Sequence, residues 1–186
     1  AVALGAQSLD AEESVNLSLG TVFRVGDVSV TIDGYQIDID DRIVLSENLT
    51  AENVRQYLAD QGFIGIGGGR FFINGVDTET TRLDQVVNWN LTTNNTGDFD
   101  FTLVANVNST DVTAIPEVAE LAALDPAPVL FGRVNVLSLE EGTPKNKLGA
   151  IVNWSLEQYG VTLRATRYGD VLTPGTSADR DFTLTA

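Results

Sequence analysis

The stretch from Asp27 to Ser46 limits the possible folds more than any other part of the sequence. Its first half alternates apolar and polar residues with a period of two, as a strand with one apolar face does. Beyond Gly34 the apolar residues change parity: Tyr35, Ile37, Ile39, Ile43 and Leu45. A bulge at Gly34 would explain this change, because one extra residue turns every later side chain to the opposite face. The alternative is a change of surroundings, as when a strand leaves a lipid bilayer.

The same alternation recurs in hairpins along the chain. Their turns, near residues 25, 94 and 158, are short, whereas the connections at 47–70 and 110–145 are long. Short turns on one side and long loops on the other are typical of outer-membrane β-barrels. A soluble β-sandwich is the alternative, and it would bury the apolar faces. Three aromatic residues close to the short turns are expected to form an interfacial girdle: Trp89, Trp154 and Tyr159.

Composition excludes several classes of function. Acidic residues outnumber basic ones by 26 to 11, so no nucleic-acid partner is expected. The absence of His and Cys excludes Ser-His-Asp and Cys-His catalysis, an ordinary zinc site and disulfides. The remaining enzymatic alternative is a glycosidase that uses only carboxylates. No run of about 18 apolar residues indicates a transmembrane helix, but strands of about ten residues escape that test.

The long connections contain shorter patterns. Helical spacing predicts a helix over Thr50–Asp60 with Thr50 as its N-cap, and another over Pro116–Leu124. Phe131–Leu139 is predicted to be a strand, and Asp181–Ala186 begins a further one. Gly62–Gly69 is glycine-rich but lacks the context of a phosphate-binding loop, so a loop tip is expected there.

Several motifs carry a resemblance to a known family. Leu9–Gly20 (LDAEESVNLSLG) is similar to the pattern L-x-P-E-x-S-x-N-Y-S-L-G, with Ala11 in place of Pro. Asp33–Ile43 (DGYQIDIDDRI) is similar to D-Y-Y-x-I-D-I-x-D-R-I. Gly69–Thr78 and Asn146–Tyr168 match later strands, although Arg82 stands where a glycine is common. Together these segments resemble the C-terminal half of the β-barrel of TonB-dependent outer-membrane receptors.

The resemblance implies an all-β fold, an antiparallel up-and-down meander of about seven to eight strands that is part of a transmembrane β-barrel. Residues 1–186 are then expected to be a single partial β-barrel domain, a fragment of a longer chain without the plug, the TonB box and the last strands. The implied location is the bacterial outer membrane. The implied function is import of a ferric siderophore, a cobalamin or a glycan with energy from TonB, without catalysis or a cofactor.

The resemblance also implies the partners: outer-membrane lipid, the TonB complex through the missing N-terminal part, and a small-molecule ligand. The free strand edges would let the fragment self-associate. The functional alternative is a secreted, soluble β-rich adhesion or carbohydrate-binding domain. Loop position suggests ligand contacts, although shielding of the barrel rim is the alternative role. The candidate contacts are Arg55, Tyr57, Arg70 and Phe71 in the first long loop and Arg133 near the second.

Acidic residues in the stretch from Asp27 to Ser46 raise the question of a metal site. Asp38, Asp40 and Asp41 have the oxygen ligands that calcium prefers. The favoured alternative is that Asp38 and Asp40 form a solvated face and that Asp41 pairs with Arg42 or another base. No metal is therefore expected.

Overall fold

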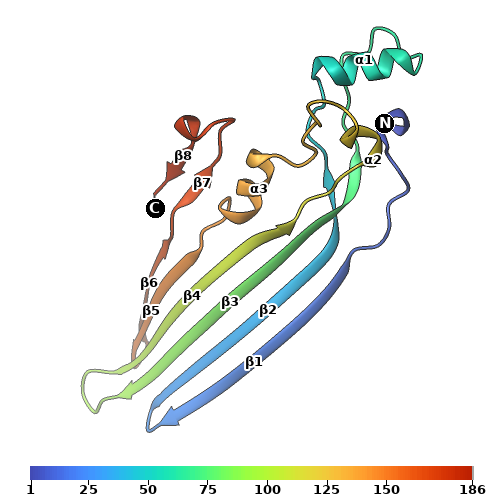
Figure 1. The fold of residues 1–186 in the computed structure, drawn as a ribbon. Helices are drawn as coiled ribbons and strands as arrows, with labels where there is room; N and C mark the ends of the chain where they lie inside the picture. Colours follow the sequence, from blue (N-terminus) through green and yellow to red (C-terminus); the bar gives the residue numbers. More distant parts are fainter. Residues whose placement is uncertain (186) are drawn as a thin grey trace.

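The computed structural model describes residues 1–185, and its main feature is one open sheet of six long antiparallel strands (Figure 1). The strands follow one another in chain order, so each pairs with its neighbours in the sequence. This is the predicted up-and-down meander, and the predicted fold class is confirmed. The strands are β1 (Glu13–Val25), β2 (Val28–Leu45), β3 (Phe72–Thr92), β4 (Asp98–Ala114), β5 (Asn146–Leu156) and β6 (Tyr159–Tyr168).

The remaining elements lie at the end of the sheet where the long loops emerge (Figure 1). Of the predicted strand Asp181–Ala186, residues 182–184 form β8, while Ala186 lies outside the described residues. None of the helices in residues 1–185 is long and apolar enough to cross a membrane. These elements are η1 (Val2–Leu4), α1 (Glu52–Asp60), α2 (Ala119–Ala122), α3 (Arg133–Glu140), η2 (Ala178–Arg180) and a small sheet of β7 (Val171–Thr173) with β8 (Phe182–Leu184).

Strand pairing decides the question raised by Gly34. The pairing of β2 runs without a register shift from Val28 to Ile39, with Leu19 on one side of Gly34 and Leu83 on the other. A bulge would displace this register by one residue. Gly34 is therefore not a bulge, and the change in the apolar pattern reflects a change of surroundings along one continuous strand.

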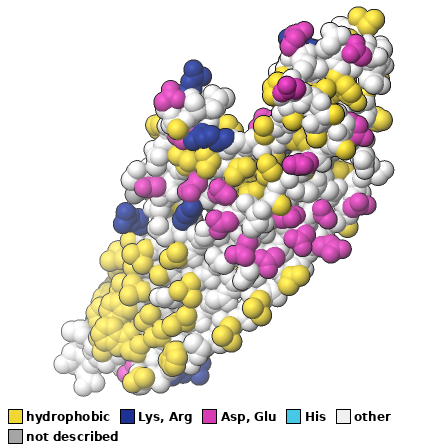
Figure 2. All heavy atoms as spheres, viewed as in Figure 1, with side chains coloured by type: hydrophobic (Ala, Val, Ile, Leu, Met, Phe, Trp, Pro, Cys, Tyr) yellow, Lys and Arg dark blue, Asp and Glu magenta, His cyan; other side chains and the backbone are white. Residues whose placement is uncertain are grey.

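The register also assigns every strand residue to a face, because directly paired residues lie on the same face of a sheet. One face is apolar near the short turns, where Val30, Val87, Leu103 and Ala150 form a row across four strands. Figure 2 shows hydrophobic side chains gathered at the short-turn end, with acidic side chains farther along the strands. We call this face the outward face. Its large exposed residues include Leu17, Leu19, Phe23, Leu83, Leu103, Val107, Leu148 and Leu163.

The outward face argues against a soluble sandwich. In residues 1–185 the only second sheet is the short β7–β8 pair, and Leu19 and Leu103 remain 83% and 51% exposed. A soluble sandwich would cover these side chains with a second sheet. A barrel wall instead leaves them for lipid.

The opposite, inward face is mostly polar, as a barrel lumen is. Its side chains hydrogen-bond across the strands: the Thr102 hydroxyl donates to Asn88 at 2.9 Å and the Thr162 hydroxyl to Asn153 at 2.8 Å. These pairs satisfy polar groups within the sheet. The inward face therefore does not require a dry protein core above it.

Aromatic residues border the outward face at the short turns, as predicted for Trp89, Trp154 and Tyr159. Trp89 stacks on Phe101 with ring centroids 5.0 Å apart. Trp154 pairs with Phe99 across β4 and β5, and its indole N–H donates to the Thr96 carbonyl at 2.7 Å. Aromatic rings with one polar atom suit the boundary between lipid and water.

The helix boundaries differ from those predicted. Helix α1 begins at Glu52 with Ala51 as its N-cap, because Leu49 pairs with Gly69 and keeps the chain extended up to that point. Thr50 therefore does not cap the helix. Helix α2 covers only Ala119–Ala122, within the longer predicted range.

The predicted strand at Phe131–Leu139 is wrong, because residues 133–140 form α3. Short apolar segments fit either period, and tertiary contacts decide between them. Here the helix satisfies its own backbone hydrogen bonds and offers side chains to its neighbours. The Glu140 carboxylate accepts from the backbone N–H of Val112 on β4 at 3.0 Å, and Asn135 donates to Glu47 at 3.0 Å.

Candidate functional site

The long loops and the N-terminal segment pack together at one end of the sheet. We call this unit, formed by residues 1–6, 46–71 and 115–131, the outer cap. Backbone hydrogen bonds tie its parts together, among them Ser46 to Phe71 at 2.9 Å and Glu47 to Leu130 at 2.8 Å. Its core consists of Leu4, Leu49, Val54, Leu58, Phe71, Val118, Leu121 and Leu130.

The structure places four of the predicted ligand contacts in the outer cap. Arg55 is exposed on α1 and pairs with Glu52, while Tyr57 on the same helix is half-buried against the cap core. Arg70 is exposed, whereas Phe71 is only 5% exposed within the core. Arg55, Tyr57 and Arg70 therefore offer surface to solvent, and the side chain of Phe71 mainly supports the cap. Their contact with a ligand stays a prediction.

Arg133, the fifth predicted contact, lies outside the cap at the start of α3. Its guanidinium donates to both carboxylate oxygens of Asp181, at 3.0 and 2.5 Å, and to the Gly175 carbonyl at 2.9 Å. The Gly175 N–H donates to the same carboxylate at 2.8 Å. The hydrogen bond from Arg133, and then that from Gly175, lowers the pKa of Asp181, and the carboxylate raises the pKa of Arg133. In this structure Arg133 fastens the β7–β8 segment to α3.

This contact predicts a pH dependence. A carboxyl group with a lowered pKa stabilises the folded form above its ordinary pKa, and loses that effect as the pH falls through the folded pKa. We therefore expect the protection of residues 171–185 against hydrogen exchange, measured relative to the intrinsic exchange rate at the same pH, to decrease as the pH falls below the ordinary carboxyl pKa of about 4. Asp181→Asn should remove this pH dependence, whereas Asp179→Asn should keep it. Equal protection relative to the intrinsic rate at pH 3 and pH 6 in the unmodified protein would contradict the assignment.

The acidic residues Asp38, Asp40 and Asp41 lie on β2, and they do not form the expected pair. The Gln36 amide bridges Asp38 and Glu79 at 3.1 and 3.0 Å, and Arg42 donates to the Thr78 hydroxyl at 3.1 Å. Within residues 1–185 Asp41 forms an ion pair neither with Arg42 nor with another base, so the predicted pairing of Asp41 is wrong. In residues 1–185 no group of at least three Asp, Glu, His or Cys residues is arranged to hold a metal ion.

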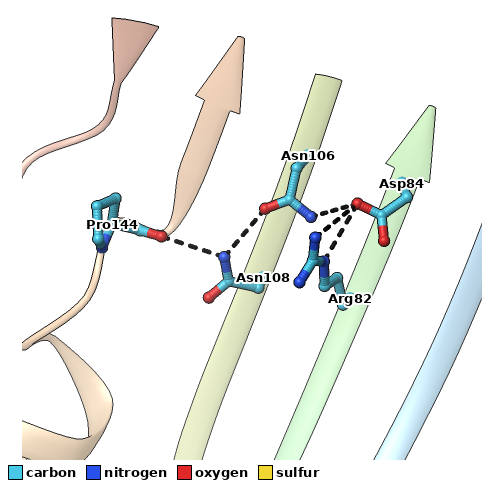
Figure 3. A network of polar contacts seen from close by, with 5 residues as sticks. All are labelled: Arg82, Asp84, Asn106, Asn108 and Pro144. Atoms are coloured by element: carbon cyan, nitrogen blue, oxygen red, sulfur yellow. Dashed lines mark hydrogen bonds and ion pairs between the residues drawn. The ribbon is translucent and has the colours of Figure 1, made fainter. Parts of the chain in front are cut away.

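A polar network occupies the inward face near the middle of β3 and β4 (Figure 3). Arg82 donates to Asp84 at 3.0 and 3.1 Å, and the Asn106 amide donates to the same carboxylate oxygen at 2.6 Å. Asn108 continues the network to Asn106 at 3.3 Å and to the Pro144 carbonyl at 3.1 Å. The network therefore links two strands to the segment that leads into β5.

Arg82 causes no fault in the sheet, although it stands where a glycine is common. It pairs with Tyr35 on one side and Asn108 on the other in an unbroken register. Its guanidinium lies 5.7 Å from the centroid of the Tyr35 ring. The inward face accommodates this long charged side chain because lumen positions are polar. Sequence reasoning did not select these residues as a site, although their shared parity is a signal that would have grouped them.

The fold now defines a class of protein. Long antiparallel strands in a meander, an apolar outward face, a polar inward face and long loops at one end are the features of a transmembrane β-barrel wall. The family described as TonB dependent receptor-like, beta-barrel matches residues 1–185. The chain belongs to this family, which confirms the resemblance seen in its motifs. A comparison with curated proteins gave no match.

Membership in this family indicates the location, the general role and the general partners of such proteins. The family consists of bacterial outer-membrane proteins, which confirms the predicted location. Its members are receptors and transporters, and not enzymes. The general partners of the family are the outer membrane and TonB.

Proposed function

We propose that this chain is part of the barrel of a receptor that imports a scarce ligand with energy delivered through TonB. The ligand classes are a ferric siderophore, a cobalamin or a glycan. The observation that carries the proposal is the family match over residues 1–185 on a sheet with an apolar outward face and a polar inward face. The chain itself contributes the wall and the outer cap, and the energy enters through other parts of the receptor.

The outer cap is the proposed place of first ligand contact. It lies at the long-loop end, where loops of outer-membrane barrels face the exterior. Arg55, Tyr57 and Arg70 present a charged or aromatic surface there, and Arg133 lies on the neighbouring α3. Phe71 contributes indirectly, because its burial holds the first loop in place.

The sheet edges support a further part of the proposal. In residues 1–185, β1 and β6 each pair with one strand only. Unpaired N–H and C=O groups on such edges favour addition of another strand. We propose that these edges continue the barrel in the complete receptor. In the isolated chain the same edges would pair between copies.

The experiment uses cells that produce the complete receptor. Radiolabelled ferrichrome, cyanocobalamin and maltohexaose serve as probes of the three ligand classes. We expect one probe to accumulate inside cells, and we expect deletion of TonB or addition of a protonophore to abolish accumulation while leaving surface binding in the cold intact.

Accumulation that persists in the absence of TonB would contradict energy coupling. A receptor that gives no surface binding and no accumulation of any probe would contradict the proposal for these ligand classes. The secreted adhesion domain is not favoured, because its apolar sheet face would need a cover that residues 1–185 do not supply.

A further inference from the structure

A groove of ≈ 340 Å³ lies on the inward face, away from the outer cap. Strands β2, β3, β4, β5 and β6 all contribute to it, together with residues 143–144 of the segment before β5. Its lining includes Asn106 and Asn108 of the polar network. Two tyrosines and two basic side chains also line it: Tyr35, Arg82, Lys147 and Tyr168.

Each basic side chain of the groove lies against an aromatic ring. The Arg82 guanidinium carbon is 5.7 Å from the centroid of Tyr35, and the Lys147 ammonium is 5.3 Å from the centroid of Tyr168. A cation over a ring face is attracted by the ring, which restricts the otherwise flexible side chain. Both cations are thus held beside the groove before any ligand arrives.

The charges of the groove differ from those of the rest of the chain. The protein carries a formal charge of −15, yet within residues 1–185 Lys147 forms no ion pair. The other lysine, Lys145, pairs with Glu141 at 2.6 Å. Asp84 partly neutralises the positive charge of Arg82. The ammonium of Lys147 lies over the Tyr168 ring, and its N–H donors remain available to a ligand in the groove.

The amide groups of the groove are fixed by one another. Asn106 donates to Asp84 and accepts from Asn108, which also donates to the Pro144 carbonyl. These bonds fix the amides in place and leave an ammonium and a guanidinium as the charged donors. Such donors recognise carboxylate and phosphate oxygens through charge-assisted hydrogen bonds.

We propose that the groove between Tyr35 and Tyr168 binds an anionic oxygen group, a carboxylate or a phosphate, with Lys147 as the main contact and Arg82 as the second. The source of this group is a free anion in the lumen or an acidic side chain of a protein segment inside the barrel. The inference rests on the proposed function only in placing the inward face toward the lumen.

The test uses the purified complete receptor in zwitterionic detergent at low salt, with citrate as the probe. Isothermal titration calorimetry should detect citrate binding that Lys147→Gln weakens by about tenfold or more, the usual effect of removing a charged hydrogen-bond donor. Lys147→Arg should retain binding. Lys145→Gln is the matched control and should bind citrate within about twofold of the unmodified receptor. Because this is an equilibrium measurement without TonB, its outcome is independent of the transport experiment.

A second arm identifies the source of the anion. If a carboxylate of the receptor fills the groove, citrate will not bind, but Lys147→Gln will lower the melting temperature at low salt, and added sodium chloride will reduce the difference. Lys145→Gln will not reproduce this salt-dependent loss. The proposal is overturned if citrate does not bind the unmodified receptor and both glutamine variants melt alike at every salt concentration.

Discussion

Replacing Leu103 with Arg is expected to lower the free energy of unfolding of the complete receptor in a lipid bilayer by about 2–4 kcal/mol. Leu103 lies on the outward face, 51% exposed, between Val87 and Ala150 in the middle of the apolar region. An arginine there would place its guanidinium in hydrocarbon, where water cannot solvate it. The measurement is a urea titration of the receptor in phosphatidylcholine vesicles. The folded fraction is monitored by the mobility shift of folded barrels on gels.

The matched control is the next residue along the same strand. Val104 lies on the inward face between Val86 and Gly149, so an arginine at this position points toward the lumen. Val104→Arg is expected to cost less than about 1 kcal/mol, because its charge remains solvated. An equal or larger loss for Val104→Arg would show that the two faces have been assigned the wrong way round.

The strands could be predicted from the sequence because each of them carries a period of two over many residues. Once Leu103 and Val107 are placed on one face of β4, the opposite face follows, since side chains alternate. The parity change at Gly34 was visible for the same reason. Its cause was not, because a bulge and a change of surroundings produce the same pattern; the pairing of Gly34 with both Leu19 and Leu83 decides between them.

The structure of the long connections could not be predicted as well as that of the strands, because it depends on contacts between residues that are distant in sequence. α3 is a helix where the local pattern predicted a strand, and its contacts with β4 and Glu47 come from other parts of the chain. The inward groove has the same origin. Tyr35 and Tyr168 line one groove only because the strands between them place them on the same face.

The candidate ligand contacts illustrate both what could and what could not be predicted from the sequence. Arg55 and Tyr57 are predicted contacts because they belong to a long connection, and both lie on α1 within that connection. Their contact with a ligand stays a prediction. The burial of Phe71 could not be read from its neighbours, since Leu4 and Leu121, which share its core, lie far away in the sequence. Loop membership alone therefore does not separate surface residues from supporting ones.

The core of the outer cap leads to the second large expected effect. Leu121 is 1% exposed and packs in the core formed by residues from all three segments of the cap. Leu121→Ala is expected to reduce the stability of the cap by about 2–5 kcal/mol, because it removes buried methyl groups and leaves a cavity. The cap should then open more often, while the strands of the sheet keep their hydrogen bonds.

Hydrogen–deuterium exchange of the complete receptor measures this difference directly. In Leu121→Ala, peptides from residues 46–71 should exchange faster, whereas peptides from residues 98–107 of β4 should be unchanged. Val129→Ala is the control in the same connection, because Val129 is 59% exposed and its truncation leaves no buried cavity. Ligand binding should weaken as hydrogen exchange of the cap becomes faster, because Arg55 and Tyr57 depend on α1 for their positions. Unchanged exchange in residues 46–71 would mean that the first long loop does not depend on α2, and that the cap is not one cooperative unit.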